Sequence, residues 1–474
     1  MNRKQRRADN KTAPAQAVSS AEDFLYTAAL EHYQGQRTAM AERTLRQLLA
    51  LNPRHAPSLV LLAILALDAQ NFPAAIEFCR LAIAIAPNNA EAHCNLGNAH
   101  HHQAKYLESL PHLRRSVRIN PNRFEAQVSL GNTLRALGQL DEAIAAYRKA
   151  TSLQPQSADA HNTLAMALLA KGDFGAGWQE YEFRWQTPQL FPARPQYAEP
   201  QWHGQAAPGK TLLIHDEQGF GDTLQFCRLA SLAADRGLRV ILTAAPALIA
   251  LLKSLRGIDH LIPRGEPVPA FDLYCPMMSL PLALGITIDT IPAPIPYLHA
   301  DPQIIADFRA RLGPTTCKRI GLVWAGNPRK GQRLLTLVDS RRSIDAALLA
   351  PLFEVPGLEF ISLQKDGPAA PAHFPLIDLM PAIHDFAGTA ALIANLDLVI
   401  CVDTSVAHLA GALGKPVWLL DRYDHCWRWL NGRRDSPWYP NLRIYRQPRP
   451  HDWLSVIQQV AQDLQSFAQE PASP

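Results

Sequence analysis

The chain has 474 residues, of which 47% are hydrophobic and 19% are charged, a composition that excludes a disordered protein. Its length exceeds what a single hydrophobic core usually holds, so we expect two or three domains. A formal net charge of +4 is too small to indicate a nucleic acid as partner.

The sequence carries no signal for membrane insertion or secretion. No apolar stretch reaches the roughly 18 residues that a transmembrane helix needs, and no apolar segment follows the basic residues at positions 3–7. The seven cysteines form no CxxC pair and are expected to be reduced thiols. We therefore expect a cytoplasmic protein without a transmembrane segment, with a disordered basic tail at residues 1–21 and a second tail at residues 469–474.

A 34-residue period runs through the first third of the chain. Prolines that each follow a helical apolar pattern recur at Pro53, Pro87, Pro121 and Pro155. One position of each unit holds a small residue, at Ala29, Ala63, Gly97, Gly131 and Ala165. The small residue lets two antiparallel helices approach closely, and the proline ends the second helix. This pattern resembles the tetratricopeptide repeat, with four full units from residue 22 to 157 and a partial fifth up to residue 187.

Repeats of this kind stack into a superhelix with a concave face that can bind a partner. We interpret the array as a binding surface for a protein or a glycan, the alternative being that it only solubilises or dimerises the chain. The fifth unit ends in the aromatic and charged segment 181–185, which we expect to dock onto the next domain. Residues His100–His102 point around a helix, so they cannot converge on one metal ion and are expected at the surface.

The remainder of the chain alternates predicted strands and helices. A stretch rich in proline and aromatic residues at 188–208 is expected to be an ordered connector. Predicted strands lie at residues 211–215, 239–243, 258–262 and 271–274, and, after a proline-rich stretch at 291–296, at residues 319–324, 358–363 and 398–402. This alternation predicts two parallel doubly wound sheets, in domains 209–300 and 301–468. A cleft between their strand ends would suit a substrate that needs closure around it.

The segment 398–420 is the most informative part of the sequence. It predicts a buried strand to Val402, a turn at residues 403–405, a short Ala-rich helix and a second strand at residues 417–420. The turn then lies at the carboxyl edge of a parallel sheet, where ligands bind in such folds. Asp403, Thr404 or Ser405 can cap the helix, whose free amides and dipole suit an anion such as a diphosphate. An ordinary capped turn is the alternative interpretation.

A second candidate site follows the strand at residues 211–215. Gly219 and Gly221 allow close backbone approach or a positive φ. Asp222 can cap the next helix, which is predicted to start near it, and can also face the cleft. There a carboxylate could accept a proton from an attacking hydroxyl. Capping alone is the alternative.

Further candidates lie in the second half. Arg341 and Arg342 are expected to open a helix, where the helix dipole disfavours them unless an anion compensates; a solvated loop is the alternative. Gln364 follows a predicted strand and could face the same crevice. His408 lies one turn into the Ala-rich helix and faces either the ligand or the neighbouring strand. The sequence has no metal-ligand spacing and no Walker loop, so we expect no metal.

These motifs support a family resemblance. From about Lys210 to Ala468 the chain looks like a GT-B glycosyltransferase of the heptosyltransferase-like (family 9-like) type, carried by segments 219–223 and 403–409. The whole chain resembles bacterial proteins in which tetratricopeptide repeats precede such a domain. The resemblance implies an all-α repeat superhelix followed by an α/β GT-B fold, with two Rossmann-like domains facing a cleft. It also implies metal-independent transfer of a sugar from a nucleotide-sugar, with inversion at the anomeric carbon. The nucleotide-sugar is then a substrate, so no cofactor is expected.

The resemblance also implies roles for individual residues. Asp222 matches the proposed base, and Arg342 matches a basic donor-phosphate contact, with Arg341 and Lys330 as alternatives. The contacts to the donor nucleotide and its diphosphate fall on Asp403, Thr404, Ser405 and His408. Ser405 stands where the family usually has glycine, which narrows the space for a diphosphate. Two other classes stay open: a non-catalytic repeat scaffold with a degenerate GT-B domain, and a sugar-nucleotide epimerase.

Overall fold

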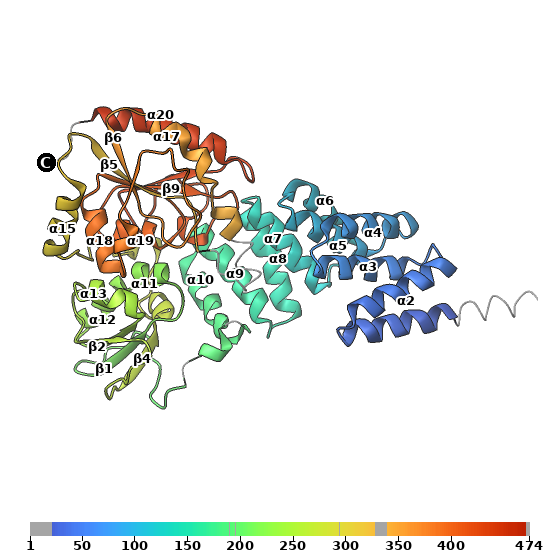
Figure 1. Ribbon diagram of the computed structural model, residues 1–474. Helices are drawn as coiled ribbons and strands as arrows, with labels where there is room; N and C mark the ends of the chain where they lie inside the picture. Colours follow the sequence, from blue (N-terminus) through green and yellow to red (C-terminus); the bar gives the residue numbers. More distant parts are fainter. Residues whose placement is uncertain (1–20, 189, 195, 293, 328–338, 471–474) are drawn as a thin grey trace, which may run out of the picture. The chain divides into compact units, whose positions relative to one another are not determined.

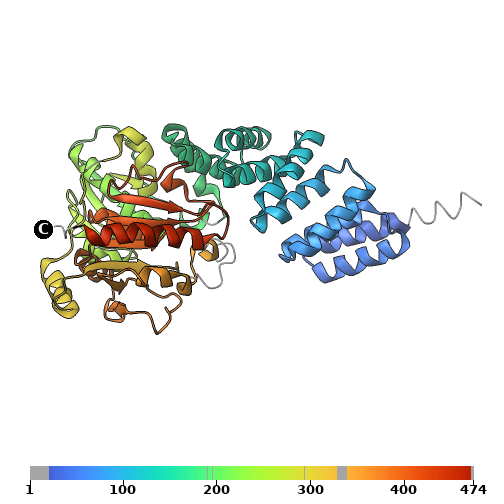
Figure 2. The same ribbon diagram turned by 90° about the horizontal axis from the view of Figure 1, so that it is seen from above.

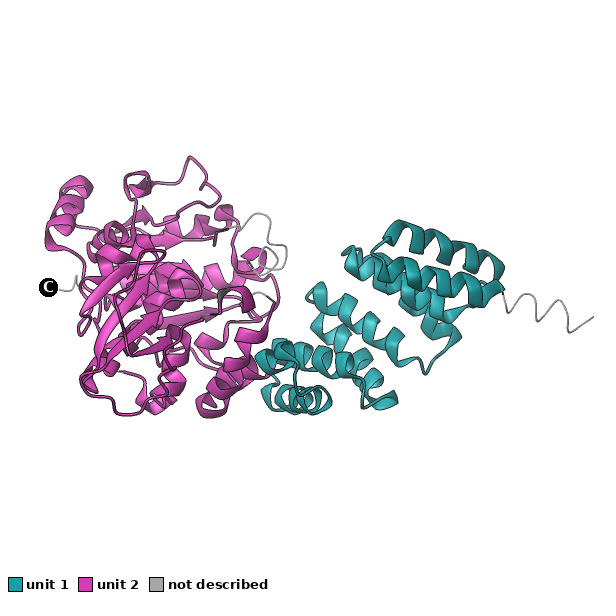
Figure 3. Cartoon of the chain, turned by 90° about the horizontal axis from the view of Figure 1, so that it is seen from below, with its two compact units in different colours: residues 1–163 teal, residues 164–474 magenta. Residues whose placement is uncertain are grey.

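The computed structural model describes residues 21–188, 190–194, 196–292, 294–327 and 339–470. The chain divides into two compact units, residues 1–163 and 164–474 (Figure 3). Of the tails predicted at residues 1–21 and 469–474, residues 1–20 and 471–474 lie outside the described residues, whereas residue 21 begins a helix and Gln469 ends one. Among the helices in the described ranges, none is long and apolar enough to cross a membrane.

The first unit consists of paired helices that follow the predicted 34-residue period (Figure 1). A helix at residues 21–34 precedes α2 (Thr38–Leu51), α3 (Ala56–Asp68), α4 (Phe72–Ile85), α5 (Ala90–His102), α6 (Tyr106–Ile119), α7 (Phe124–Ala136) and α8 (Leu140–Leu153). The next helix, α9 (Ala158–Lys171), runs across the boundary into the second unit. The predicted helical repeat superhelix is confirmed.

The small-residue position explains why the paired helices pack so closely. A Cβ atom added to Gly97 on α5 would lie 2.5 Å from Cγ of Leu113 on α6. The same atom added to Gly131 on α7 would lie 2.5 Å from the ring of Tyr147 on α8. A larger residue at either position would therefore force the two helices of its repeat apart.

One expectation for the repeats was wrong. His100 is buried rather than at the surface, with 7% of its area exposed. Its ring stacks on that of His112, with 6.0 Å between the centroids, because both helices of this repeat turn histidines inward. No group of three or more histidine, cysteine or acidic residues in the described part of the chain is arranged to hold a metal ion.

The second unit contains two parallel sheets. The first has the strand order β3-β2-β1-β4, with β1 (Thr211–His215), β2 (Arg239–Ala244), β3 (His260–Pro263) and β4 (Leu273–Pro276). The second has the order β10-β9-β8-β5-β6-β7, with β5 (Lys318–Val323), β6 (Leu358–Ser362), β7 (Leu376–Asp378), β8 (Leu398–Val402), β9 (Val417–Asp421) and β10 (Leu442–Arg446). The strands β7 and β10 at its two edges were not predicted.

Helices alternate with the strands along the chain in both halves, as predicted. The first half contains α11 (Phe220–Phe226), α12 (Arg228–Asp235), α13 (Pro246–Leu252) and α14 (Leu280–Ala283). The second contains α15 (Pro302–Leu312), α17 (Ala350–Phe353), α18 (Phe386–Ala394), α19 (Ser405–Ala412) and α20 (Trp453–Gln469). The last of these packs against β10 and α17 (Figure 2). The strand β8 lies between β5 and β9 and all five of its residues are buried, which fixes the turn after it at the carboxyl edge of the sheet.

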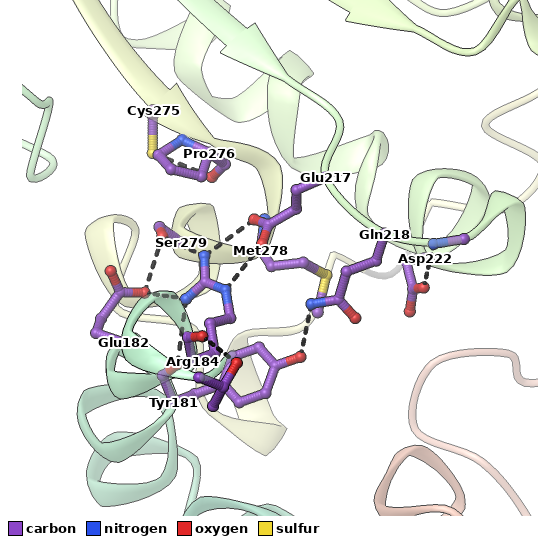
Figure 4. Close-up of polar contacts among 12 residues, drawn as sticks. Tyr181, Glu182, Arg184, Glu217, Gln218, Asp222, Cys275, Pro276, Met278 and Ser279 are labelled. Atoms are coloured by element: carbon purple, nitrogen blue, oxygen red, sulfur yellow. Dashed lines mark hydrogen bonds and ion pairs between the residues drawn. The ribbon is translucent and has the colours of Figure 1, made fainter. Parts of the chain in front are cut away.

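The segment after the repeats docks as predicted. Helix α10 (Phe174–Tyr181) leads into the 3-10 helix η1 (Glu182–Gln186), in which Arg184 is 1% exposed. Its guanidinium donates two hydrogen bonds to Glu217 after β1, of 2.8 and 2.9 Å, and one of 2.8 Å to Ser279 (Figure 4). In the connector, Trp202 is fully buried and its amide donates to the carbonyl of Tyr274 on β4 over 2.7 Å.

Candidate functional site

A cavity of about 530 Å³ lies between the two halves of the second unit. The first half contributes residues 218–222 and Arg264, and the second contributes Gly326, Asn327, Arg342, residues 403–405, His408, Arg422, Cys426 and Arg428. The cavity therefore contains both predicted motifs, which are about 180 residues apart in the sequence. Helices α11 and α19, which follow these motifs, pack against each other.

Most of the predicted site residues line this cavity, namely Gly219, Gly221, Asp222, Arg342, Asp403, Thr404, Ser405 and His408. Gln364 is not among the lining residues. Its side-chain oxygen accepts the N–H groups of Trp324 (3.1 Å) and Ala325 (2.9 Å), and its nitrogen donates to the carbonyl of Ala325 (3.0 Å). Gln364 therefore braces the loop that carries Gly326 into the cavity.

Asp222 combines the two roles that the sequence left open. It lies in the first turn of α11, which starts at Phe220, two residues before Asp222, and its Oδ2 accepts the N–H of Gly219 over 2.9 Å. Its Oδ1 is paired with Nη2 of Arg428, from the second half. The carboxylate thus caps its own helix and also faces the cavity.

No sequence motif predicted a role for Arg428. It lies in the 3-10 turn η7 (Trp427–Trp429), within a segment that has no helical or strand periodicity. Its guanidinium lies over the ring of Trp427, 4.3 Å from the centroid. An arginine between two tryptophans was the only local signal that could have identified it.

The start of α19 differs from the expectation in one respect. The N-cap residue is Thr404, whose side chain makes no capping hydrogen bond. Its Oγ1 is buried and has no hydrogen-bond partner among the described residues. The helix start therefore faces the cavity without the side-chain cap that the sequence predicted.

Gly221 is required where α11 crosses α19. A Cβ atom at this position would lie 3.0 Å from Cδ2 of His408 and 3.5 Å from Cα of Ser405. The glycine at position 221 therefore allows the two helices to approach closely. At Gly219, φ is −84°, so its backbone conformation does not require glycine.

His408 is a buried, neutral histidine at the wall of the cavity. It is 4% exposed, and its Nδ1 lies 3.0 Å from the hydroxyl of Tyr439. Its ring stacks on Trp429, with 5.1 Å between centroids. Burial lowers the pKa of His408 to about 3, and the nearby charge of Arg428 acts in the same direction.

Arg342 reaches the cavity, but from the end of a helix rather than from its start. Residues 339–342 are helical and the helix ends at Arg342, where the dipole favours a basic residue. The guanidinium donates to Oδ1 of Asp339 and to the carbonyl of Asp403, both over 2.9 Å. The alternative Arg341 is paired with Asp424. The other alternative, Lys330, lies outside the described residues.

Four of the residues that line the cavity are arginines, and each forms an ion pair with an aspartate. The pairs are Arg264–Asp216, Arg342–Asp339, Arg422–Asp424 and Arg428–Asp222. Because acidic partners hold the guanidinium groups in place, their orientation does not depend on a ligand. The lining also contains two carboxylates, Asp222 and Asp403. Because a guanidinium has five N–H donors, a paired arginine can still donate to an anion with several oxygens.

Comparison with known proteins finds matches to two kinds of family in different parts of the chain. Tetratricopeptide-repeat family models match residues 26–90, 90–123 and 131–172. The model of glycosyltransferase family 9 (heptosyltransferase) matches residues 370–423, which include the turn before α19. The chain is therefore similar to tetratricopeptide-repeat proteins within residues 26–172 and to glycosyltransferase family 9 over residues 370–423.

Protein FlbA of Caulobacter vibrioides is 28% identical to this chain over 336 residues, which cover 63% of this chain and 54% of FlbA. The chain thus spans about half the length of this relative. Among solved structures, MamA has 21% identity and a TM-score of 0.31, over 35% of this chain and 97% of MamA. A thermophilic TPR protein in Thermus thermophilus has 21% identity and a TM-score of 0.31, over 35% of this chain and 92% of that chain.

Proposed function

We propose that this chain is a glycosyltransferase that moves a sugar from a nucleotide-sugar to an acceptor hydroxyl. The observation that carries the proposal is the cavity in which Asp222 of one half faces arginines and the start of α19 from the other half. A carboxylate and an anion-binding wall across a cleft are what this transfer needs. The family 9 match over residues 370–423 supports the same class of reaction.

The proposed reaction is a single, inverting displacement without a metal ion. Asp222 accepts the proton of the acceptor hydroxyl as its oxygen forms a bond to the anomeric carbon. The bond from that carbon to the phosphate oxygen breaks, and its electron pair leaves with the nucleoside diphosphate. Arg342 and the start of α19, at Asp403, Thr404 and Ser405, stabilise the charge that develops on the leaving group.

We also propose a role for the repeats in recruiting the acceptor. Tetratricopeptide arrays present an extended concave surface, and we propose that this one recruits the acceptor, a protein or a glycan. Removing residues 21–157, which leaves α9 whole, would then raise KM for a large acceptor but leave KM for the nucleotide-sugar unchanged.

A non-catalytic binding domain is the second candidate, and two observations favour it. Both oxygens of Asp222 already accept hydrogen bonds, and Ser405 occupies the helix start that lines the cavity. Such a domain would bind a nucleotide-sugar without turnover.

A donor screen followed by a turnover assay tests both candidates. A nucleotide-sugar at about 100 times its Kd stabilises the folded state by about 2.7 kcal/mol, so a thermal-shift panel identifies the donor. Release of nucleoside diphosphate with formation of an inverted glycoside supports the transferase. Donor binding without any release, across a panel of acceptors, supports the binding domain. Isomerised sugar without an acceptor would instead indicate an epimerase.

A further inference from the structure

The ion pair between Asp222 and Arg428 joins the two halves of the second unit. The residues are 206 positions apart, and their side chains are 20% and 12% exposed at the cavity wall. Nη1 of Arg428 donates to Sγ of Cys426 over 3.3 Å, while Nη2 is paired with Oδ1 of Asp222. The arginine is thus held on one side by its own loop and on the other by the proposed base.

This pair differs from the other three arginine pairs of the cavity. The aspartates that form ion pairs with Arg264, Arg342 and Arg422 do not line the cavity, so an anion in the cavity does not compete directly with those three aspartates. Arg428 is paired with a carboxylate that does line it. Phosphate and carboxylate oxygens bind a guanidinium in the same way, so a diphosphate in the cavity competes with Asp222 for Arg428.

The competition has a consequence for the proposed base. While Arg428 is paired with Oδ1 and the N–H of Gly219 donates to Oδ2, both carboxylate oxygens already accept a hydrogen bond. Moving Arg428 to a phosphate frees Oδ1 and leaves the cap at Gly219 intact. The carboxylate then keeps its position, with one oxygen open to an acceptor hydroxyl.

We propose that Arg428 is a positioning residue that couples donor binding to the release of Asp222. Arg428 is paired with Asp222; when a donor enters the cavity, the guanidinium contacts its diphosphate instead and Asp222 becomes available. The donor therefore binds before the acceptor is activated. This inference rests on the proposed function, because it takes Asp222 as the base and a diphosphate as the ligand.

Calorimetry on the full chain tests this coupling, with UDP, GDP, ADP and CDP as probes. Loss of the guanidinium in Arg428→Gln should weaken binding of the preferred diphosphate roughly tenfold. Removing the competitor in Asp222→Asn should tighten binding by roughly three- to tenfold. The gain should vanish in the double variant, which should bind like Arg428→Gln alone.

A matched control uses Arg264, a cavity arginine with a partner outside the lining. In the Arg264→Gln background, Asp222→Asn should still tighten binding, because the competition at Arg428 is intact. If Arg428→Gln does not fold, as judged by circular dichroism, Arg428→Met replaces it, since methionine keeps an unbranched side chain but removes the cation that pairs with Asp222.

The outcomes separate this inference from the proposed function. If a nucleoside diphosphate binds the wild type but Asp222→Asn leaves its affinity unchanged or weaker, the coupling is overturned and the proposed function stands. The same holds if Asp222→Asn tightens binding equally with and without Arg428. If none of the probes and no nucleotide-sugar binds the wild type, both are overturned.

Discussion

Arg184 and Glu217 form a two-point ion pair whose side chains are only 1% and 2% exposed. Glu217 also accepts the N–H of Met278 over 2.9 Å, so each of its oxygens is used. The pair fastens the segment after α10 to the carboxyl edge of the first sheet, two residues before Gly219. The same edge carries Asp222, so this buried pair supports the wall of the cavity.

Substituting Glu217 tests how much the second unit depends on this pair. Glu217→Gln leaves Glu182 as the remaining acidic partner of the buried Arg184, and loss of the charged hydrogen bonds to Glu217 should lower the free energy of unfolding by about 1.5–3 kcal/mol. All nine tryptophans lie between Trp178 and Trp453, so tryptophan fluorescence in urea reports on the second unit alone.

The control for this measurement is an exposed ion pair. Arg256 and Asp235 are 70% and 45% exposed, and Asp235→Asn should leave the urea midpoint nearly unchanged. Equal effects of the two substitutions would contradict the role assigned to the buried pair.

The crossing of α11 and α19 makes Gly221 sensitive to a single methyl group. Gly221→Ala places a Cβ 3.0 Å from His408, which should cost about 1–3 kcal/mol of stability. Gly175 on α10 is the control, because a Cβ there meets no atom within 4 Å. Gly175→Ala should stabilise the second unit slightly, since alanine favours a helix. Similar urea midpoints for the two variants would exclude close packing as the reason for Gly221.

Asp222→Asn tests the proposed base. An amide cannot accept the proton, so kcat for transfer should fall by about 10²–10⁴-fold, with the circular dichroism spectrum unchanged. The measurement is the rate of glycoside formation at saturating nucleotide-sugar. Wild-type turnover in this variant would remove Asp222 from the mechanism.

His408 should make the second unit sensitive to acid. Its pKa is lowered by burial to about 3, whereas an unfolded histidine titrates near 6.5. The unfolded chain therefore binds more protons below pH 6.5, and stability is lost as the pH falls from about 6.5 toward 3. At pH 5 the loss from this residue is about 2 kcal/mol.

The corresponding measurement compares urea unfolding at pH 7.5 and pH 5. The variant His408→Gln should lose less stability over this interval than the wild type. The control His203→Gln removes an exposed histidine and should keep the wild-type pH dependence. An unchanged pH dependence in His408→Gln would show that His408 is not held neutral by the fold.

Much of the architecture was predictable because it depends on neighbouring residues. A 34-residue period of prolines and small residues reports helix ends and helix contacts that recur in every unit. The motifs at Gly219–Asp222 and Asp403–Ser405 follow buried strands directly, so their place at a carboxyl edge is a property of the local chain. The edge strand β7 was missed because it has three residues, and β10 because an irregular segment precedes it.

The arrangement of the side chains that line the cavity depends on the tertiary structure. Arg428 belongs to a segment without periodicity, and its partner Asp222 is 206 residues away, so nothing near it in sequence indicates the pair. Arg342 reaches the cavity from a helix end rather than a helix start, and Gln364 braces a loop instead of lining the wall. Sequence patterns report backbone conformation and burial, which are local, whereas the direction of a charged side chain depends on the charges that the fold brings to it. For this reason the sequence by itself determined the repeats, the sheets and the two motifs, and only the tertiary structure decided that Arg428 pairs with Asp222.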